Sequence, residues 1–128
     1  MAIIDEKFNI ENNRGSMLSL NIKTTNRTDG TPYTFQKDDV VRFKIMEKNK
    51  CENVILQKDV IVGEASEIVP LTITSEEMRI GDIINKPVEY WYEVELNPDT
   101  SSAVTILGYT KAGGARILTL TPEGGDKK

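Results

Sequence analysis

Two pairs of adjacent carboxylates are the first residues in this chain that could do chemistry. Asp38 stands beside Asp39, and Glu76 stands beside Glu77. Two carboxyl groups that face one cleft can act as general acid and general base, but adjacent residues on a strand or turn point in different directions. We therefore expect Asp38-Asp39 to serve a turn and Glu76-Glu77 to favour the start of a short helix.

The inventory of catalytic and metal-binding residues is short. Histidine is absent, which removes the commonest general base and the commonest metal ligand together. The single cysteine, Cys51, can form no internal disulfide and stands in a polar stretch typical of a loop. Asn97-Pro98-Asp99 offers too few oxygen ligands for calcium, and the glycines match no phosphate-binding loop. The sequence therefore predicts no catalytic residue, no metal and no cofactor.

Trp91 is the residue whose surroundings favour a binding site. It shares one side of a predicted strand with Glu89, Glu93 and Glu95. A large aromatic on such a face can anchor a protein partner or stack on a sugar. The alternative is that the loop after Leu96, or a second sheet, covers the indole.

The first twelve residues hold three further candidates for an interface. Ile3, Ile4 and Phe8 lie among charged residues, and residues 1–12 could form an extra strand or an arm that reaches a neighbouring subunit. The predicted interface therefore combines Trp91 and its glutamates with this arm.

Strands are the elements that must position these residues. Apolar side chains take every second place in residues 18–23 and 41–45, which is typical of strands with one face on a core and the other in water. In residues 88–96 the same alternation puts Tyr90 and Tyr92 on the core face. Further strands are predicted over residues 54–62, 68–73, 104–109 and 116–121.

Turn residues separate these strands. Asp29-Gly30-Thr31-Pro32 predicts a chain reversal. Residues 63–66 suit a short hairpin connection between the predicted strands 54–62 and 68–73. Pro70 marks the second of these, the strand 68–73, as an edge strand. Residues 75–81 begin with Ser75 and end with Gly81, which predicts about one turn of helix capped by the serine.

Length and charge narrow the class of protein. A chain of 128 residues has room for one core. We expect an all-β antiparallel sandwich of seven or eight strands over residues 13–122, followed by a mobile tail at 123–128. The net charge of -4, with basic residues scattered singly, argues against a nucleic-acid partner. The start resembles no signal peptide, and no apolar stretch could cross a membrane, so we expect synthesis in the cytoplasm.

Three stretches resemble the N-terminal domain of phage baseplate upper proteins and similar small tail proteins of phages of Gram-positive bacteria. The first is Asn13-Arg14-Gly15 with the alternating strand that follows it. The second covers residues 29–45, a turn and an acidic step into a core strand. The third covers residues 71–96 and ends in the aromatic strand. With the closing strands, the resemblance spans most of residues 13–122.

This resemblance implies an immunoglobulin-like or related β-sandwich that serves as a structural, non-catalytic part of a virion tail or baseplate. Its expected partners are other tail or baseplate proteins, and a homo-oligomer is possible. A carbohydrate-binding or host-surface adhesion module is the second hypothesis, since sugars stack on aromatics beside carboxylates. A glycosidase with a carboxylate pair across two strands is the third.

Overall fold

The computed structural model describes residues 3–4, 8–26, 29–81, 86–101, 103–108, 114 and 116–122. The predicted tail at 123–128 lies outside these residues, as does most of the stretch 109–115. The described part of the chain forms nine strands: β1 (Ile3–Ile4), β2 (Ile10–Asn13), β3 (Leu18–Ile22), β4 (Val40–Glu47), β5 (Lys50–Ile61), β6 (Val69–Ile73), β7 (Val88–Leu96), β8 (Val104–Leu107) and β9 (Arg116–Thr121). The all-β prediction is confirmed.

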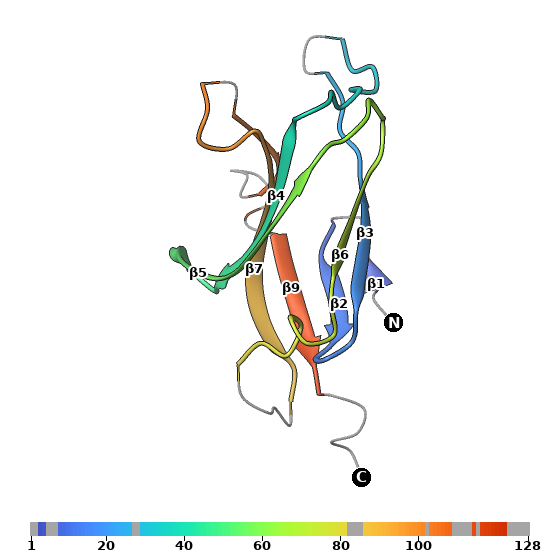
Figure 1. The fold of residues 1–128 in the computed structure, drawn as a ribbon. Helices are drawn as coiled ribbons and strands as arrows, with labels where there is room; N and C mark the ends of the chain where they lie inside the picture. Colours follow the sequence, from blue (N-terminus) through green and yellow to red (C-terminus); the bar gives the residue numbers. More distant parts are fainter. Residues whose placement is uncertain are drawn as a thin grey trace.

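The strands form two sheets, which Figure 1 shows as two layers. The larger sheet has the order β1-β2-β9-β7-β4-β5, with β8 also paired to β7. Most of its pairs are antiparallel, but β2 runs parallel to β9. The smaller sheet is the antiparallel pair β3 and β6. The fold is therefore a two-sheet, sandwich-like arrangement in which one layer is much wider than the other.

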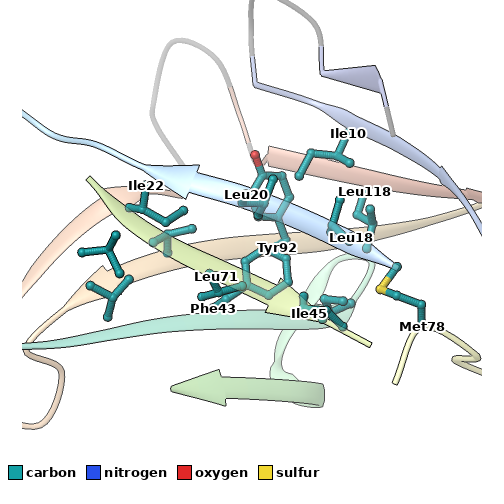
Figure 2. Packing of buried hydrophobic residues seen from close by; sticks show 14 of the residues in the cluster. Ile10, Leu18, Leu20, Ile22, Phe43, Ile45, Leu71, Met78, Tyr92 and Leu118 are labelled. Atoms are coloured by element: carbon teal, nitrogen blue, oxygen red, sulfur yellow. The ribbon is translucent and has the colours of Figure 1, made fainter. Parts of the chain in front are cut away.

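The core lies between the two layers, where the apolar sides of the alternating strands meet. Figure 2 shows Leu20 and Leu71 of the small sheet packed over Phe43 and Tyr92 of the large sheet. Phe43 is fully buried and Tyr92 is 2% exposed, whereas Tyr90 is half-buried at the edge of the cluster. The prediction that the tyrosines of β7 face the core is confirmed, and Trp91 consequently faces the opposite side of the sheet.

The predicted helix over residues 75–81 is not present. The stretch forms a single turn, in which the Met78 amide donates to the Thr74 carbonyl (3.0 Å). The capping residue is Thr74 and not Ser75: its hydroxyl accepts from the Glu77 amide (3.2 Å), and the Glu77 carboxylate accepts from the Thr74 amide (2.9 Å). This reciprocal capping was mistaken for a helix start because caps and acidic residues are local signals, whereas helix length depends on residues further along.

The connection at residues 63–66 is not a hairpin turn. The preceding strand, β5, pairs with β4 in the large sheet, and the following strand, β6, pairs with β3 in the small one. The connection therefore carries the chain from one layer to the other. The prediction for Cys51 was also wrong, because the backbone of Cys51 lies in β5 and not in a loop. The turn before it is formed by Lys48 and Asn49, where Asn49 takes a φ of 66°.

The segment before residue 13 takes part in the large sheet. Ile3 and Ile4 form β1, which pairs antiparallel with β2, and Ile10 in β2 is 3% exposed within the core. Of the two alternatives for residues 1–12, an extra strand or an arm, the described residues Ile3–Ile4 and Ile10–Asn13 form strands. The reversal at residues 29–32 is present as expected: Gly30 has a φ of 73°, and the Asp29 carboxylate accepts from both the amide and the hydroxyl of Thr31.

Candidate functional site

An apolar row crosses the outer side of the large sheet at Trp91. In the register of the sheet, Trp91 lies opposite Met46 of β4 and Ile117 of β9, and Met46 lies opposite Val54 of β5. Cross-strand partners share one side of a sheet, so these four side chains form one row, the Trp91 row. Met46 is 2% exposed, Trp91 and Ile117 are half-buried, and Val54 is 42% exposed.

Ion pairs flank the Trp91 row on both sides. On one side, Lys44 Nζ lies 2.8 Å from Oε1 of Glu93 and 3.1 Å from Oε1 of Glu95. On the other side, Lys48 Nζ lies 2.7 Å from Oε1 of Glu89. Each glutamate beside the tryptophan thus has a lysine partner. The face that looks acidic in the sequence of β7 alone is therefore partly neutralised, because two lysines from β4 and the turn after it pair with its three glutamates.

Lys44 is the central charge of this arrangement. Burial lowers the pKa of its ammonium group, but hydrogen bonds to Glu93 and Glu95 outweigh that effect, and the net direction is upward. Lys44 therefore stays charged at neutral pH. A partner that displaced Lys44 would leave two carboxylates close together, which is unfavourable. We therefore expect Lys44, Glu93 and Glu95 to stay paired at the rim of the row when a partner binds.

The structure brings together only part of the predicted interface. Trp91, Glu89 and Glu93 lie on the outer side of β7, as the alternation predicted. Phe8 is 52% exposed, but it lines an apolar groove between the sheets instead of the outer face. Ile3 and Ile4 lie in β1 at the far end of the strand order, with β2 and β9 between them and β7. The arm and the tryptophan therefore do not form one continuous site.

Sequence reasoning missed the residues that extend the site beyond β7. Met46 could have been found from the sequence. It shares the outer side of β4 with Arg42 and Lys44, and an apolar side chain interrupts that otherwise charged side. Val54 and Ile117 carried no such signal, since their place beside Met46 and Trp91 depends on the register between strands distant in sequence.

The carboxylate pair Asp38-Asp39 serves a turn, as expected. Asp38 takes a φ of 75°, and Asp39 accepts hydrogen bonds from the Tyr33 hydroxyl (2.8 Å) and the Gln36 amide (2.8 Å). The Asn97 side chain adds a third hydrogen bond to Asp39 (3.1 Å) and accepts one from the Val40 amide (2.9 Å). The pair thus ties two loops to the start of β4.

This network gives a pH-dependent contribution to stability. Burial raises the pKa of Asp39, but hydrogen bonds from Gln36, Asn97 and Tyr33 outweigh burial and hold it below its usual value. A carboxyl that binds its proton less tightly when folded stabilises the fold above its unfolded pKa of about 4 and loses that contribution as the pH falls through the folded pKa. Asp39→Asn should therefore cost about 1 to 3 kcal/mol at pH 7 and less near pH 3.

Urea unfolding of both proteins at several pH values measures this difference. Lys37→Ala, an exposed change in the same loop, serves as the control and should give a small, pH-independent loss. An Asp39→Asn loss that stays constant from pH 7 to pH 3 would show that the Asp39 charge does not stabilise the loops.

Within the described residues, no three of the side chains Cys, Asp and Glu gather in the way that a metal ion requires. The Asn97-Pro98-Asp99 loop uses its polar groups internally, because Asp99 pairs with Arg42 (3.1 Å) and Asn97 is bound to Asp39 and Val40. The described residues also include no helix long and apolar enough to span a bilayer.

Comparison with known proteins assigns this chain to no family. No protein-family model matches the chain, and a search of curated proteins finds no match.

Proposed function

We propose that this chain is a non-enzymatic assembly domain that binds another protein through the Trp91 row. The observation that supports this function is the row itself, an apolar strip with a tryptophan at its centre and ion pairs along both sides. Protein interfaces combine an apolar, aromatic centre with a polar rim that keeps the free surface soluble. The row and its rim have this composition.

The pairing of the glutamates favours a protein over a sugar as the partner. A carbohydrate site needs carboxylates whose oxygens can accept hydrogen bonds from hydroxyl groups beside the aromatic ring. Here Glu89, Glu93 and Glu95 are held by Lys48 and Lys44 at 2.7 to 3.1 Å. A sugar would have to compete with these lysines, whereas a protein surface can pack on the apolar row and leave the ion pairs in place.

We also propose that the fold is immunoglobulin-like. In immunoglobulin domains strand B pairs with E, and strands G, F, C and C′ pair in that order in the other sheet. Here β3 pairs with β6, and the large sheet contains the run β9-β7-β4-β5. The strands thus correspond in sequence order and in partners, which supports the fold that the resemblance to baseplate proteins implies.

The proposed setting is the tail or baseplate of a phage, with other tail or baseplate proteins as partners. The resemblance of residues 13–22, 29–45 and 71–96 to such proteins supports this setting. In it, the chain is made in the bacterial cytoplasm and then joins the virion through protein contacts, with no catalytic step.

Binding to the proteins encoded by the neighbouring reading frames tests this function. Each is purified and titrated against the chain by calorimetry. Trp91→Ala should weaken binding by about 30-fold or more, the loss expected at a hot spot. Because Trp91 lies beside the buried Met46, the same change should also lower the melting temperature by a few degrees, which circular dichroism measures separately.

The matched control is Ile61→Ala, which removes another apolar side chain from the outer side of the same sheet. Ile61 is 68% exposed and lies opposite Val40, at the other end of β5 from the row. Its loss should leave binding unchanged. Equal binding by Trp91→Ala and the parent protein would reject the row as the interface. A glycan array signal that Trp91→Ala abolishes would instead support the adhesion hypothesis.

A further inference from the structure

An apolar groove runs along the edge of β3 that faces away from β6. The groove has two adjoining parts, with volumes of about 310 and 710 Å³, and consecutive residues 19–25 form one wall of the larger part. Both the outward residues, Ser19 and Asn21, and the inward residues, Leu20 and Ile22, line it, so the groove follows the strand edge itself. No residue of β6 lines the larger part. The floor and the other wall come from Phe8, Ile10, Tyr92, Val94, Ile106 and Leu107.

The edge of β3 beside this groove pairs with no other strand in the described chain. The sole partner of β3 there is β6. The register also shows which backbone groups face the groove. Asn21 lies opposite Pro70, which has no amide hydrogen. Proline is compatible with the non-hydrogen-bonded pairs of an antiparallel ladder, so Asn21 and Pro70 form such a pair. In that pattern the amide and carbonyl groups of Ser19 and Asn21 point away from β6, toward the groove.

The charge of the groove restricts what it can hold. Among the described residues, Lys23 is the one charged residue that lines the larger part, and it lines the smaller part together with Glu67. Lys44, Lys48 and Lys58 are paired with carboxylates of the chain, but Lys23 forms no ion pair among the described residues. A negatively charged group in the larger part would therefore meet the Lys23 ammonium, whereas Glu67 would repel such a group from the smaller part.

We propose that this groove binds an extended segment of a partner protein, with apolar side chains at alternate positions and a carboxylate that meets Lys23. The segment adds a strand to the small sheet beside β3. Its backbone pairs with Ser19 and Asn21, its apolar side chains cover Tyr92, Ile106 and Leu107, and its other side chains face water. The site lies on the inner side of the large sheet, so it is separate from the Trp91 row. This proposal therefore does not depend on the proposed function of the row.

A synthetic peptide tests the proposal. In the probe, valine alternates with threonine and both ends carry glutamate, so that either strand direction places an acid near Lys23. Fluorescence anisotropy measures its binding. One control peptide has the same composition with the valines in a block, and another carries lysine at both ends. The alternating acidic peptide should bind at least about tenfold more tightly than either control.

Two matched variants separate the backbone edge from the side chain. Asn21→Pro removes an edge amide that the ladder to β6 does not use, and it should weaken peptide binding by about tenfold. Asn21→Ala keeps the amide and should bind as the parent does. Lys23→Glu should reverse the preference, so that the lysine-ended peptide binds better. Circular dichroism confirms that each variant is folded.

The outcomes decide the proposal. Absence of binding by the alternating peptide, or equal binding by the scrambled peptide, would overturn it. Sedimentation of the chain alone covers a second occupant: self-association that Asn21→Pro abolishes would assign the groove to another copy of this chain and would overturn the partner segment. Amide exchange that slows at Ser19 and Asn21 when the peptide is added would support the edge pairing directly.

Discussion

Replacing Tyr92 by alanine is expected to lower the free energy of unfolding by about 3 to 5 kcal/mol, the usual loss when a large aromatic is removed from a core. Tyr92 is 2% exposed, and its ring centroid lies 5.5 Å from that of Phe43. Its hydroxyl donates a hydrogen bond to the Phe8 carbonyl, so the side chain also ties the segment before β2 to the centre of β7. Urea unfolding followed by circular dichroism measures the loss.

Tyr92→Phe separates the two contributions. This variant keeps the ring against Phe43 and removes only the hydroxyl, so it should cost about 1 kcal/mol. If Tyr92→Ala costs less than about 1 kcal/mol, within the range of ordinary surface changes, then the ring does not support the core in the way that its burial indicates.

The faces of individual strands could be read from the sequence because alternation is a local property. The bounds of β7 and β9 agree with the predicted strands at 88–96 and 116–121, and the opposite orientations of Tyr92 and Trp91 followed from the same period of two. An alternating segment shows which residues share a side. It carries this information without reference to any neighbouring strand.

The partners of the strands could not be read in the same way. Residues 54–62 and 68–73 looked like a hairpin because they are close in sequence, yet β5 and β6 belong to different sheets. The parallel pairing of β2 with β9 joins segments more than a hundred residues apart. Pairing of this kind depends on how the whole chain buries its apolar sides, and a local pattern does not contain it.

The same limit explains what was missed in the candidate site. Glu89, Glu93 and Glu95 look like an acidic face when β7 is considered alone. The lysines that pair with them, Lys44 and Lys48, come from β4 and its turn, and the register of β4 against β7 brings them together. Only the local half of the site, Trp91 among its glutamates, was accessible to sequence reasoning.

Replacement of Arg14 is the second change with a large expected effect. This residue was named from the sequence only as part of the stretch that precedes an alternating strand. Arg14 is 7% exposed, and its guanidinium group donates to three successive backbone carbonyls, those of Arg79 (3.3 Å), Ile80 (3.1 Å) and Gly81 (2.9 Å). Among the described residues no carboxylate pairs with it. Its role is therefore to hold the end of the turn that begins at Thr74 against the loop between β2 and β3.

Arg14→Ala is expected to lower the free energy of unfolding by about 2 to 3 kcal/mol, because carbonyl groups at a partly buried site lose a charged donor. Arg14→Lys keeps the charge but not the planar fork that reaches three carbonyls, so it should recover only part of the loss. Urea unfolding measures both, with the exposed change Lys37→Ala as the control at under about 0.5 kcal/mol. Full recovery by lysine would show that Arg14 acts through its charge alone, and a loss for Arg14→Ala no larger than that of Lys37→Ala would contradict its role in holding the turn.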